Sequence, residues 1–327
     1  MSKGMLARGL IAAVLLLLVT PSIEAWAQSY PDKLIRIIAP FPAGGLADTF
    51  GRAVGEELQK SLGQTVIVEN RPGAGGNVGA DAVAKSDPDG YTLLLSSAGI
   101  LTTNEFLYSK MPFDTEKAFA PITVIADMPM LMVVHPKLNV GTVQEFLTLA
   151  RAQAGKLNFG SAGTGTTGHL ALARFLKTAD LDVKHVAYRG AAPSVQDLVG
   201  GHIDGLFDNP PTVINHIEGG AIRALAVAAK TRMPQLPNVP TMSEAGVPGF
   251  EASSWFALVA PANTPSDVIA KLHAETVKAL RKPELQERFA KLGARLVGNS
   301  PQEFAAQIVA ERKLWGDTIK SAGIKAE

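Results

Sequence analysis

Two loops rich in glycine, proline and hydroxyl residues carry the residue types that could bind an anion. The first spans residues 39–45 (APFPAGG) and the second residues 159–168 (FGSAGTGTTG); each follows an apolar run and precedes a stretch with helical spacing. A helix that begins at such a loop presents unpaired backbone N–H groups and the positive end of its dipole. Two such loops in the two halves of the chain predict two lobes that hold one small anionic ligand between them.

The second loop adds side-chain hydrogen-bond donors to its backbone. Ser161, Thr164, Thr166 and Thr167 place four hydroxyl groups within seven positions. One helix cap uses fewer hydroxyls than this, so we expect some of them to contact a ligand. The alternative is that all four only cap the helix.

The string GTGTTG at residues 163–168 also matches the dinucleotide pattern G-x-G-x-x-G. That pattern requires an acidic residue at the end of the next strand, which here ends at Tyr188 and Arg189. Arg189 could accept a 2′-phosphate, so an exported NADP-dependent enzyme stays open as an alternative. A small carboxylate needs only the amino end of the helix.

The first loop has a conformationally restricted backbone whose amide groups are accessible. Pro40 and Pro42 restrict it, and Gly44 and Gly45 leave its amides open to a ligand. Asp48 is predicted to be the N-cap of the helix that follows, with ligand contact as a second role.

Two further candidates end predicted strands. Arg189 is the best single candidate for a charged side chain that pairs with a carboxylate. The alternative is that Arg189 is a surface arginine without a role in ligand binding. Asp208 ends a strand at the edge where open α/β sheets place their ligands.

The chain shows no motif for catalysis or metal binding. Its six histidines are scattered without metal-ligand spacing, no G-x-S-x-G string is present, and neither glycine-rich loop is followed by a Walker lysine. We therefore expect a protein that is not an enzyme and uses no cofactor and no metal.

The first 27 residues have the pattern of a signal peptide. Lys3 and Arg8 precede an apolar stretch at residues 10–20, and Ala25-Trp26-Ala27 forms a small-x-small cleavage site. An uncleaved membrane anchor is the alternative. No later segment resembles a membrane span, so we expect the mature chain to be exported, without stable membrane insertion.

The net charge and the cysteine content of the chain exclude several classes of binding partner and site. Cleavage after Ala27 removes two of the 31 basic and one of the 30 acidic residues, so 29 of each remain. A neutral chain has no electrostatic case for binding nucleic acid. The absence of cysteine excludes disulfides, thiolate metal sites and a lipid-modified N-terminal cysteine.

Strands and helices alternate along both halves, which predicts an α/β fold with mostly parallel sheets. The apolar runs predict strands at residues 34–39, 65–70, 91–97, 156–161, 183–188 and 202–208. Helical spacing predicts helices at residues 48–61, 169–178, 193–199, 265–280, 283–292 and 301–320. Residues 230–249, rich in proline, are expected to form a long packed loop.

Stretches along the whole mature chain resemble the Bug-type periplasmic receptors of tripartite tricarboxylate transporters. The matching stretches are PFPAGG with Asp48 (40–48), LGQTVIVENRPGAGGNVGA (62–80), DPDGYTLL (87–94), GKLNFGSAGTGTTGHLA (155–171), HVAYRGAAPSVQDLVGGHID (185–204), RALAV (223–227), LPNVPTMSEAGVPGFE (236–251) and WFALVAPANTP (255–265).

The resemblance implies a type II periplasmic binding protein that closes on its ligand like a Venus flytrap. Lobe 1 would comprise residues 28–127 and 228–327, lobe 2 residues 128–227, and either lobe could accept the C-terminal helix. The ligand would be a di- or tricarboxylate, an acidic amino acid or an aromatic acid. The partner would be a membrane transporter, with a sensor kinase as the alternative.

The resemblance also places ligand-binding residues in both lobes. Carried over by position, they are Phe41, Pro42, Ala43, Gly44, Gly45, Asp48, Ser97, Ala98, Ser161, Thr164, Gly165, Thr166, Thr167, Tyr188, Arg189, Gly190 and Asp208.

Overall fold

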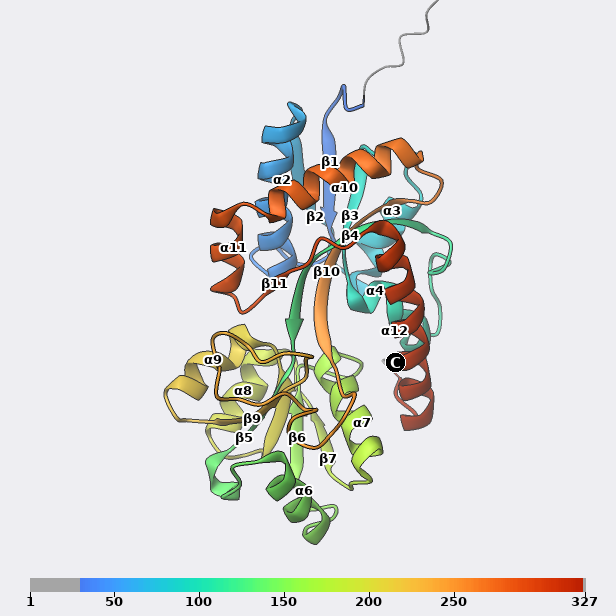
Figure 1. Cartoon of the computed structure of the whole chain (residues 1–327). Coiled ribbons are helices and arrows are strands. Elements are labelled where there is room, and N and C mark those ends of the chain that lie inside the picture. The colour runs from blue at the N-terminus through green and yellow to red at the C-terminus, as the bar shows by residue number, and fades with distance from the viewer. Residues whose placement is uncertain (1–29, 326–327) are drawn as a thin grey trace, which may run out of the picture. The chain divides into compact units, whose positions relative to one another are not determined.

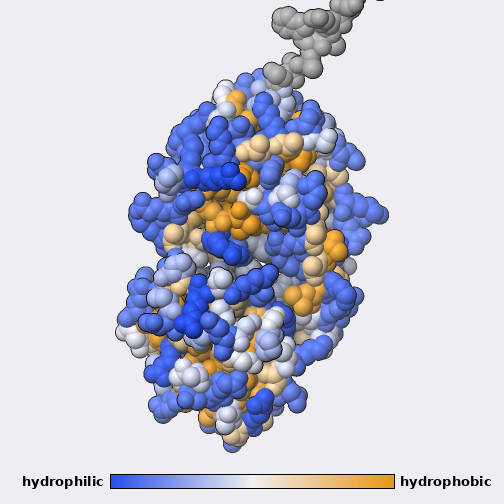
Figure 2. All heavy atoms as spheres, viewed as in Figure 1, coloured by the Kyte–Doolittle hydropathy of each residue, from blue (hydrophilic) through white to orange (hydrophobic). Residues whose placement is uncertain are grey.

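A computed structural model describes residues 30–325 of the chain (Figure 1). The predicted signal peptide, residues 1–27, and its cleavage site lie outside the described residues. Within residues 30–325, no helix is long and apolar enough to cross a membrane. Hydrophilic residues cover most of the molecular face drawn in Figure 2.

The first sheet has six strands in the order β11-β4-β10-β3-β1-β2. Its strands are β1 (Ile35–Ala39), β2 (Val66–Asn70), β3 (Thr92–Ser97), β4 (Phe119–Pro129), β10 (Ser253–Pro261) and β11 (Arg295–Leu296). Strand β1 pairs in parallel with β2 and β3, whereas β10 pairs antiparallel with β3 and β4. Apolar residues such as Ile37 and Leu94 are fully buried because helices cover this sheet.

The second sheet has five strands in the order β7-β6-β8-β5-β9. Its strands are β5 (Leu131–Val134), β6 (Asn158–Ser161), β7 (Lys184–Ala187), β8 (Gly205–Asp208) and β9 (Arg223–Val227). Strand β6 runs parallel to β7 and β8, and β5 runs antiparallel to β8 and β9. Both sheets contain parallel and antiparallel pairs. The reason is that β5 and β10, the first strands after the chain passes from one lobe to the other, run antiparallel to their neighbours.

The helices connect and cover these strands. They are α2 (Leu46–Leu62), η2 (Ala74–Gly76), α3 (Asn77–Ala84), α4 (Ala98–Thr102), α5 (Asn104–Leu107), η3 (Pro136–Leu138), α6 (Val143–Ala152), α7 (Thr167–Ala179), α8 (Ala191–Val199), α9 (Pro210–Glu218), α10 (Ser266–Leu280), α11 (Pro283–Ala290) and α12 (Pro301–Ala322). Capping boxes at Thr142 and Ser300 fix where α6 and α12 begin.

The structure corrects the predicted cap of α2. Gly45 is the N-cap, and Asp48 lies inside the first helical turn. The extended backbone of Gly45 lets the helix begin before Asp48, whose carboxylate reaches back and accepts the Gly44 N–H at 3.0 Å. The strand predicted at residues 202–208 is also shorter, because residues 201–204 form a turn and bend before Gly205.

The C-terminal helix α12 contacts helices and strands of both lobes (Figure 1). Near its start, Phe304 packs edge-on against Trp255 of β10, with ring centroids 5.4 Å apart. Farther along, Trp315 and Ile319 join the hydrophobic core of the second sheet. The helix therefore connects the two lobes in addition to the chain crossings after β4 and β9.

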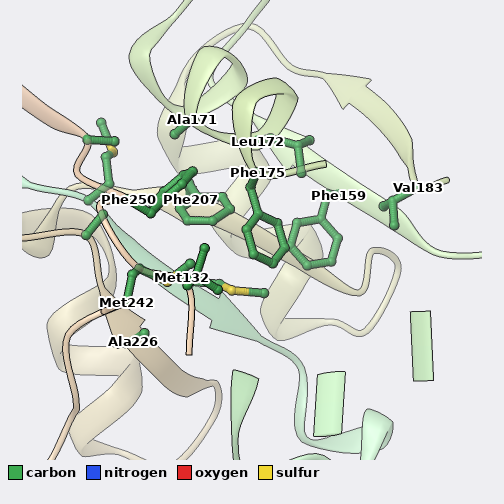
Figure 3. Close-up of a cluster of buried hydrophobic side chains, with 14 of the residues drawn as sticks. Met132, Phe159, Ala171, Leu172, Phe175, Val183, Phe207, Ala226, Met242 and Phe250 are labelled. Carbon is green, nitrogen blue, oxygen red and sulfur yellow. The ribbon is translucent and has the colours of Figure 1, made fainter. Parts of the chain in front are cut away.

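The core of the second sheet is rich in aromatic rings (Figure 3). Phe175 of α7 meets Phe207 of β8 at 5.6 Å and Phe250 at 5.9 Å between ring centroids. Phe159 of β6 completes the cluster beside Met132. This packing anchors α7 on β6 and β8, so that the position of its amino end is fixed.

Gly168, in the first turn of α7, allows the helix to start directly against β8. A Cβ atom at this position would lie 2.4 Å from the carbonyl oxygen of Phe207. Any larger residue would therefore push the amino end of α7 away from the sheet.

We expect Gly168→Ala to lower the free energy of unfolding by about 2 kcal/mol, because backbone must move to admit the methyl group. Urea denaturation should show a lower midpoint with an unchanged slope. Gly141→Ala is the matched control, because a Cβ atom added at Gly141 would lie 3.5 Å from its nearest neighbouring atom. Equal midpoints for the two variants would contradict the close approach.

Candidate functional site

A cavity of about 280 Å³ lies where loops of the two lobes meet. Seven of the predicted ligand contacts line it: Phe41, Ser97, Ala98, Thr164, Gly165, Thr166 and Thr167. They come from the loop after β1, the end of β3 and the loop between β6 and α7. The carboxyl ends of these parallel strands thus place their loops in one site, as in other open α/β sheets.

The other predicted contacts do not line this cavity. They are Pro42, Ala43, Gly44, Gly45, Asp48, Ser161, Tyr188, Arg189, Gly190 and Asp208. Several have structural partners that explain their positions.

The amino end of α7 supplies the cavity with hydrogen-bond donors. Thr166 is the N-cap residue, but its side chain makes no capping bond, because its hydroxyl donates to the Gly163 carbonyl at 2.7 Å. In residues 30–325, the amides of Thr167 and Gly168 find no acceptor. These N–H groups and the helix dipole favour an anion at this end of the cavity.

Two stacked histidines support the loop that precedes α7. The rings of His169 and His185 are parallel within 5°, with centroids 3.7 Å apart. His169 Nδ1 accepts the Gly165 N–H at 3.0 Å, and His185 Nε2 lies 2.7 Å from the Ser161 hydroxyl. A backbone amide can only donate, so Nδ1 of His169 carries no proton.

The electrostatics of this pair favour neutral rings. Burial, with a smaller contribution from His185, lowers the pKa of His169 to about 4. Burial also lowers the pKa of His185. These contacts give His169 a structural role in the loop before α7.

A polar network fixes the first loop. The Arg52 guanidinium pairs with Asp48 at 2.8 Å and lowers the pKa of that carboxyl group. Arg52 also donates to Asn70, which donates to the Phe41 carbonyl at 3.1 Å. Together with the bond from Gly44 to Asp48, this network positions Phe41 in the cavity wall.

Tyr188, Arg189 and Asp208 lie apart from the lining. The Tyr188 hydroxyl donates to Asp197 at 2.6 Å, and burial together with this bond raises the pKa of Tyr188 to about 12. Arg189 is exposed. Burial raises the pKa of Asp208 to about 6, and its carboxylate accepts the Asn209 N–H at 2.7 Å.

Sequence reasoning missed much of the cavity wall. The additional lining residues are Gly75, Gly99, Thr102, Thr103, Asn104, Leu107, Tyr108, Leu170, Ser253, Ser254, Trp255, Phe256 and Trp315. Trp255 and Phe256 lie on β10, for which the sequence predicted no ligand contact. Trp315 lies in the second half of α12, where no local pattern distinguishes it from a core residue.

No side chain that lines the cavity is charged. Among residues 30–325, no three potential metal ligands of the His, Cys, Asp or Glu type come together. The cavity can therefore bind through amides, hydroxyls and aromatic rings.

Comparison with known proteins identifies relatives along the whole chain. The family described as "Tripartite tricarboxylate transporter family receptor" matches residues 50–324. Protein BugT of Bordetella pertussis is 36% identical over 319 residues, which cover 97% of this chain and 98% of BugT.

Solved structures agree in fold. Rpa4515 of R. palustris, determined with adipate, is 35% identical, with a TM-score of 0.77 and coverage of 90% of this chain and 99% of that one. MatC of Rhodopseudomonas palustris, determined with bound malate, is 31% identical, with a TM-score of 0.73 and coverage of 89% and 100%. The structure of the periplasmic binding protein BugD is 33% identical, with a TM-score of 0.73 and coverage of 91% and 100%. The fold is thus that of a two-lobed periplasmic binding protein.

The lowered pKa of His169 predicts that the free energy of unfolding depends on pH. An unfolded His169 titrates near pH 6.5 and the folded one near 4, so the unfolded chain binds more protons between these values. The stability contribution is present above pH 6.5 and is lost as the pH falls toward 4. Between pH 7.5 and 5.0 we expect His169 to lower the free energy of unfolding by about 2 kcal/mol.

The measurement is urea denaturation at both pH values for the wild type and His169→Asn. The asparagine removes the titration, so the variant should lose about 2 kcal/mol less than the wild type over this interval. His216→Asn, at an exposed position on α9, is the matched control. A His169→Asn variant with the full wild-type loss would show that His169 does not titrate in this way.

Proposed function

Because this chain belongs to the tripartite tricarboxylate transporter receptor family, we propose that its mature form captures a small carboxylate outside the inner membrane. It would close its lobes on the ligand and deliver it to a membrane transporter of the tripartite tricarboxylate type. The observation that carries the proposal is the cavity between the lobes, whose lining includes Thr166 and Thr167 at the amino end of α7.

The nature of the ligand rests on the site and on the relatives together. A helix amino end with adjacent hydroxyl groups suits a carboxylate without any basic side chain. Rpa4515 was determined with adipate and MatC with malate, and both share the fold and about a third of the sequence. A carboxylate between the lobes of this chain is consistent with both observations.

The proposed place of action follows from the family and the leader sequence. Solved relatives include periplasmic binding proteins, and the first 27 residues read as a cleavable signal peptide. We propose cleavage after Ala27 and a periplasmic mature protein. Homologues of this kind are solute-binding proteins, and the proposed role includes no chemical step.

Closure would be driven by contacts that the ligand makes with both lobes at once. Thr164–Thr167 belong to one lobe, and Phe41, Ser97 and Ala98 belong to the other. A ligand that touches both sets binds the closed form more tightly and shifts the population toward it.

A thermal-shift screen of the ligand-free mature protein tests the proposal. A bound carboxylate at ~100 times its dissociation constant should add about 2.7 kcal/mol of stability. The panel should include dicarboxylates, tricarboxylates, acidic amino acids, aromatic acids and NADP. A shift with NADP alone would overturn the receptor proposal.

A pair of variants then locates the carboxylate. We expect Thr167→Val to weaken binding of the best carboxylate roughly tenfold or more, because it removes a hydroxyl beside a charged ligand. Thr178→Val, at an exposed position on the same helix, is the matched control. Isothermal titration gives the affinities.

Arg189→Ala tests the clamp that the sequence suggested. Because Arg189 lies outside the cavity lining, we expect its loss to change affinity by less than threefold. A large loss with Arg189→Ala and none with Thr167→Val would instead place the carboxylate near the end of β7.

A further inference from the structure

A cycle of three backbone hydrogen bonds joins the chain segments at the boundary between the lobes. Met130 lies between β4 and β5, Ala228 directly follows β9, and Ala252 directly precedes β10. The Met130 N–H donates to the Ala252 carbonyl at 2.9 Å, the Ala252 N–H to the Ala228 carbonyl at 3.0 Å, and the Ala228 N–H to the Met130 carbonyl at 2.8 Å. These three buried residues form the crossing junction. Because each of them both donates and accepts, the junction is a fixed point about which the lobes can rotate.

The first residues of β10 connect this junction to the ligand cavity. Residues 253–256 directly follow Ala252, and all four line the cavity. Strand β10 runs beside β4 from the junction into lobe 1 (Figure 1). A rotation of β10 at the junction therefore moves one wall of the cavity relative to α7.

The side chain of Arg174, on α7, binds the chain just before the junction. Its guanidinium donates to the Glu251 carbonyl at 2.6 Å and to the Gly249 carbonyl at 3.0 Å. It also lies over the ring of Phe250, with 4.8 Å between the guanidinium carbon and the ring centroid. The side chain is half-buried, so these charge-assisted bonds are partly shielded from water. The planar guanidinium thus fixes three consecutive residues that lead into Ala252.

Arg174 is also close to the cavity wall, although it lies outside the lining. Thr167 and Leu170 line the cavity and precede Arg174 by seven and four residues, which places all three on one face of α7. The guanidinium carbon lies 6.0 Å from the ring centroid of Trp315, which lines the cavity from α12. Arg174 therefore contacts the segment before the junction from the same helix that carries part of the ligand site.

From these contacts we infer that Arg174 is a positioning residue that couples α7 to the crossing junction and thereby sets the distance between the cavity walls. This inference rests on the proposed receptor function and adds the residue that controls closure. Without the guanidinium, α7 and β10 move more independently, and the lobes sample a wider range of angles. The closed arrangement then becomes a smaller fraction of the population, which weakens binding without the loss of any ligand contact.

Distance measurements by pulsed electron paramagnetic resonance test the hinge role on the ligand-free mature protein. The chain contains no cysteine, so spin labels can be attached selectively at Glu56→Cys on α2 and Gln196→Cys on α8, two exposed positions in different lobes. In this labelled protein, Arg174→Met should broaden the distribution of distances between the labels at least twofold. Methionine keeps an unbranched side chain of similar length but has no donor for the two carbonyls.

Arg151→Met is the matched control. Arg151 is an exposed residue of α6 in the same lobe and donates to the carbonyl of Ala179, the last residue of α7, at 3.3 Å. Its replacement removes an arginine-to-carbonyl bond of α7 far from the junction and should leave the distribution unchanged. Arg174→Lys keeps the charge without the planar fork and should give an intermediate width; it carries the comparison if Arg174→Met does not fold.

A purely stabilising arginine would give a different result. Its removal would lower the midpoint of urea denaturation and leave the distance distribution at its wild-type width. Equal widths for the wild type and the Arg174 variants would therefore overturn the inference.

Stopped-flow binding kinetics connect the hinge to the receptor function. The probes are adipate and malate, the acids found with Rpa4515 and MatC, together with citrate, glutamate and benzoate. For each acid that the wild type binds, Arg174→Met should raise the dissociation rate constant at least fivefold and change the association rate constant by less than twofold, because Arg174 acts on closure after the encounter. An unchanged dissociation rate constant would overturn the coupling to binding. If the wild type binds none of these acids or of the wider screen, the receptor function fails, and the distance distributions still decide the hinge role of Arg174.

Discussion

The unpaired backbone amides at the amino end of α7 are the constraint on which the site depends. Thr167 at this end lines a cavity in which no lining side chain is charged, so no residue of the lining neutralises the positive end of the helix. Their position is set by Gly168, which lets α7 start against the Phe207 carbonyl, and by the aromatic core beneath the helix. His169 then holds the preceding loop through Gly165. The position of these amides therefore depends on backbone geometry that a small number of side chains support.

Helix α12 couples this site to both lobes. Phe304 packs on Trp255 near its start, and Trp315 reaches the core of the second sheet. Both tryptophans line the cavity. A movement of one lobe relative to the other must therefore alter packing along α12, which restricts the motion to arrangements that keep these contacts. A ligand that touches both tryptophans is sensitive to that arrangement, and its differential contacts select among the states.

Local sequence pattern predicted the alternation of strands and helices and the two glycine-rich loops, because periodicity and turn chemistry are local properties. The two loops contain Phe41 and Thr164–Thr167, and the family resemblance adds Ser97; the structure brings these residues to one cavity. The sequence pattern misassigned the cap of α2, because Gly45 can start the helix without a side chain. Trp255, Trp315 and Leu107 could not be predicted, since their place in the wall depends on how distant elements cross.

The glycine-rich string at residues 163–168 shows why a motif must be read through its surroundings. In a dinucleotide site, the same string would bring the amino end of a helix to a pyrophosphate and require an acidic partner at the next strand. Here β7 ends beside Tyr188 and Arg189, and the cavity at α7 measures about 280 Å³. That volume is at the small end even for a drug-sized ligand, and a dinucleotide is larger. The same backbone physics thus favours a small anion.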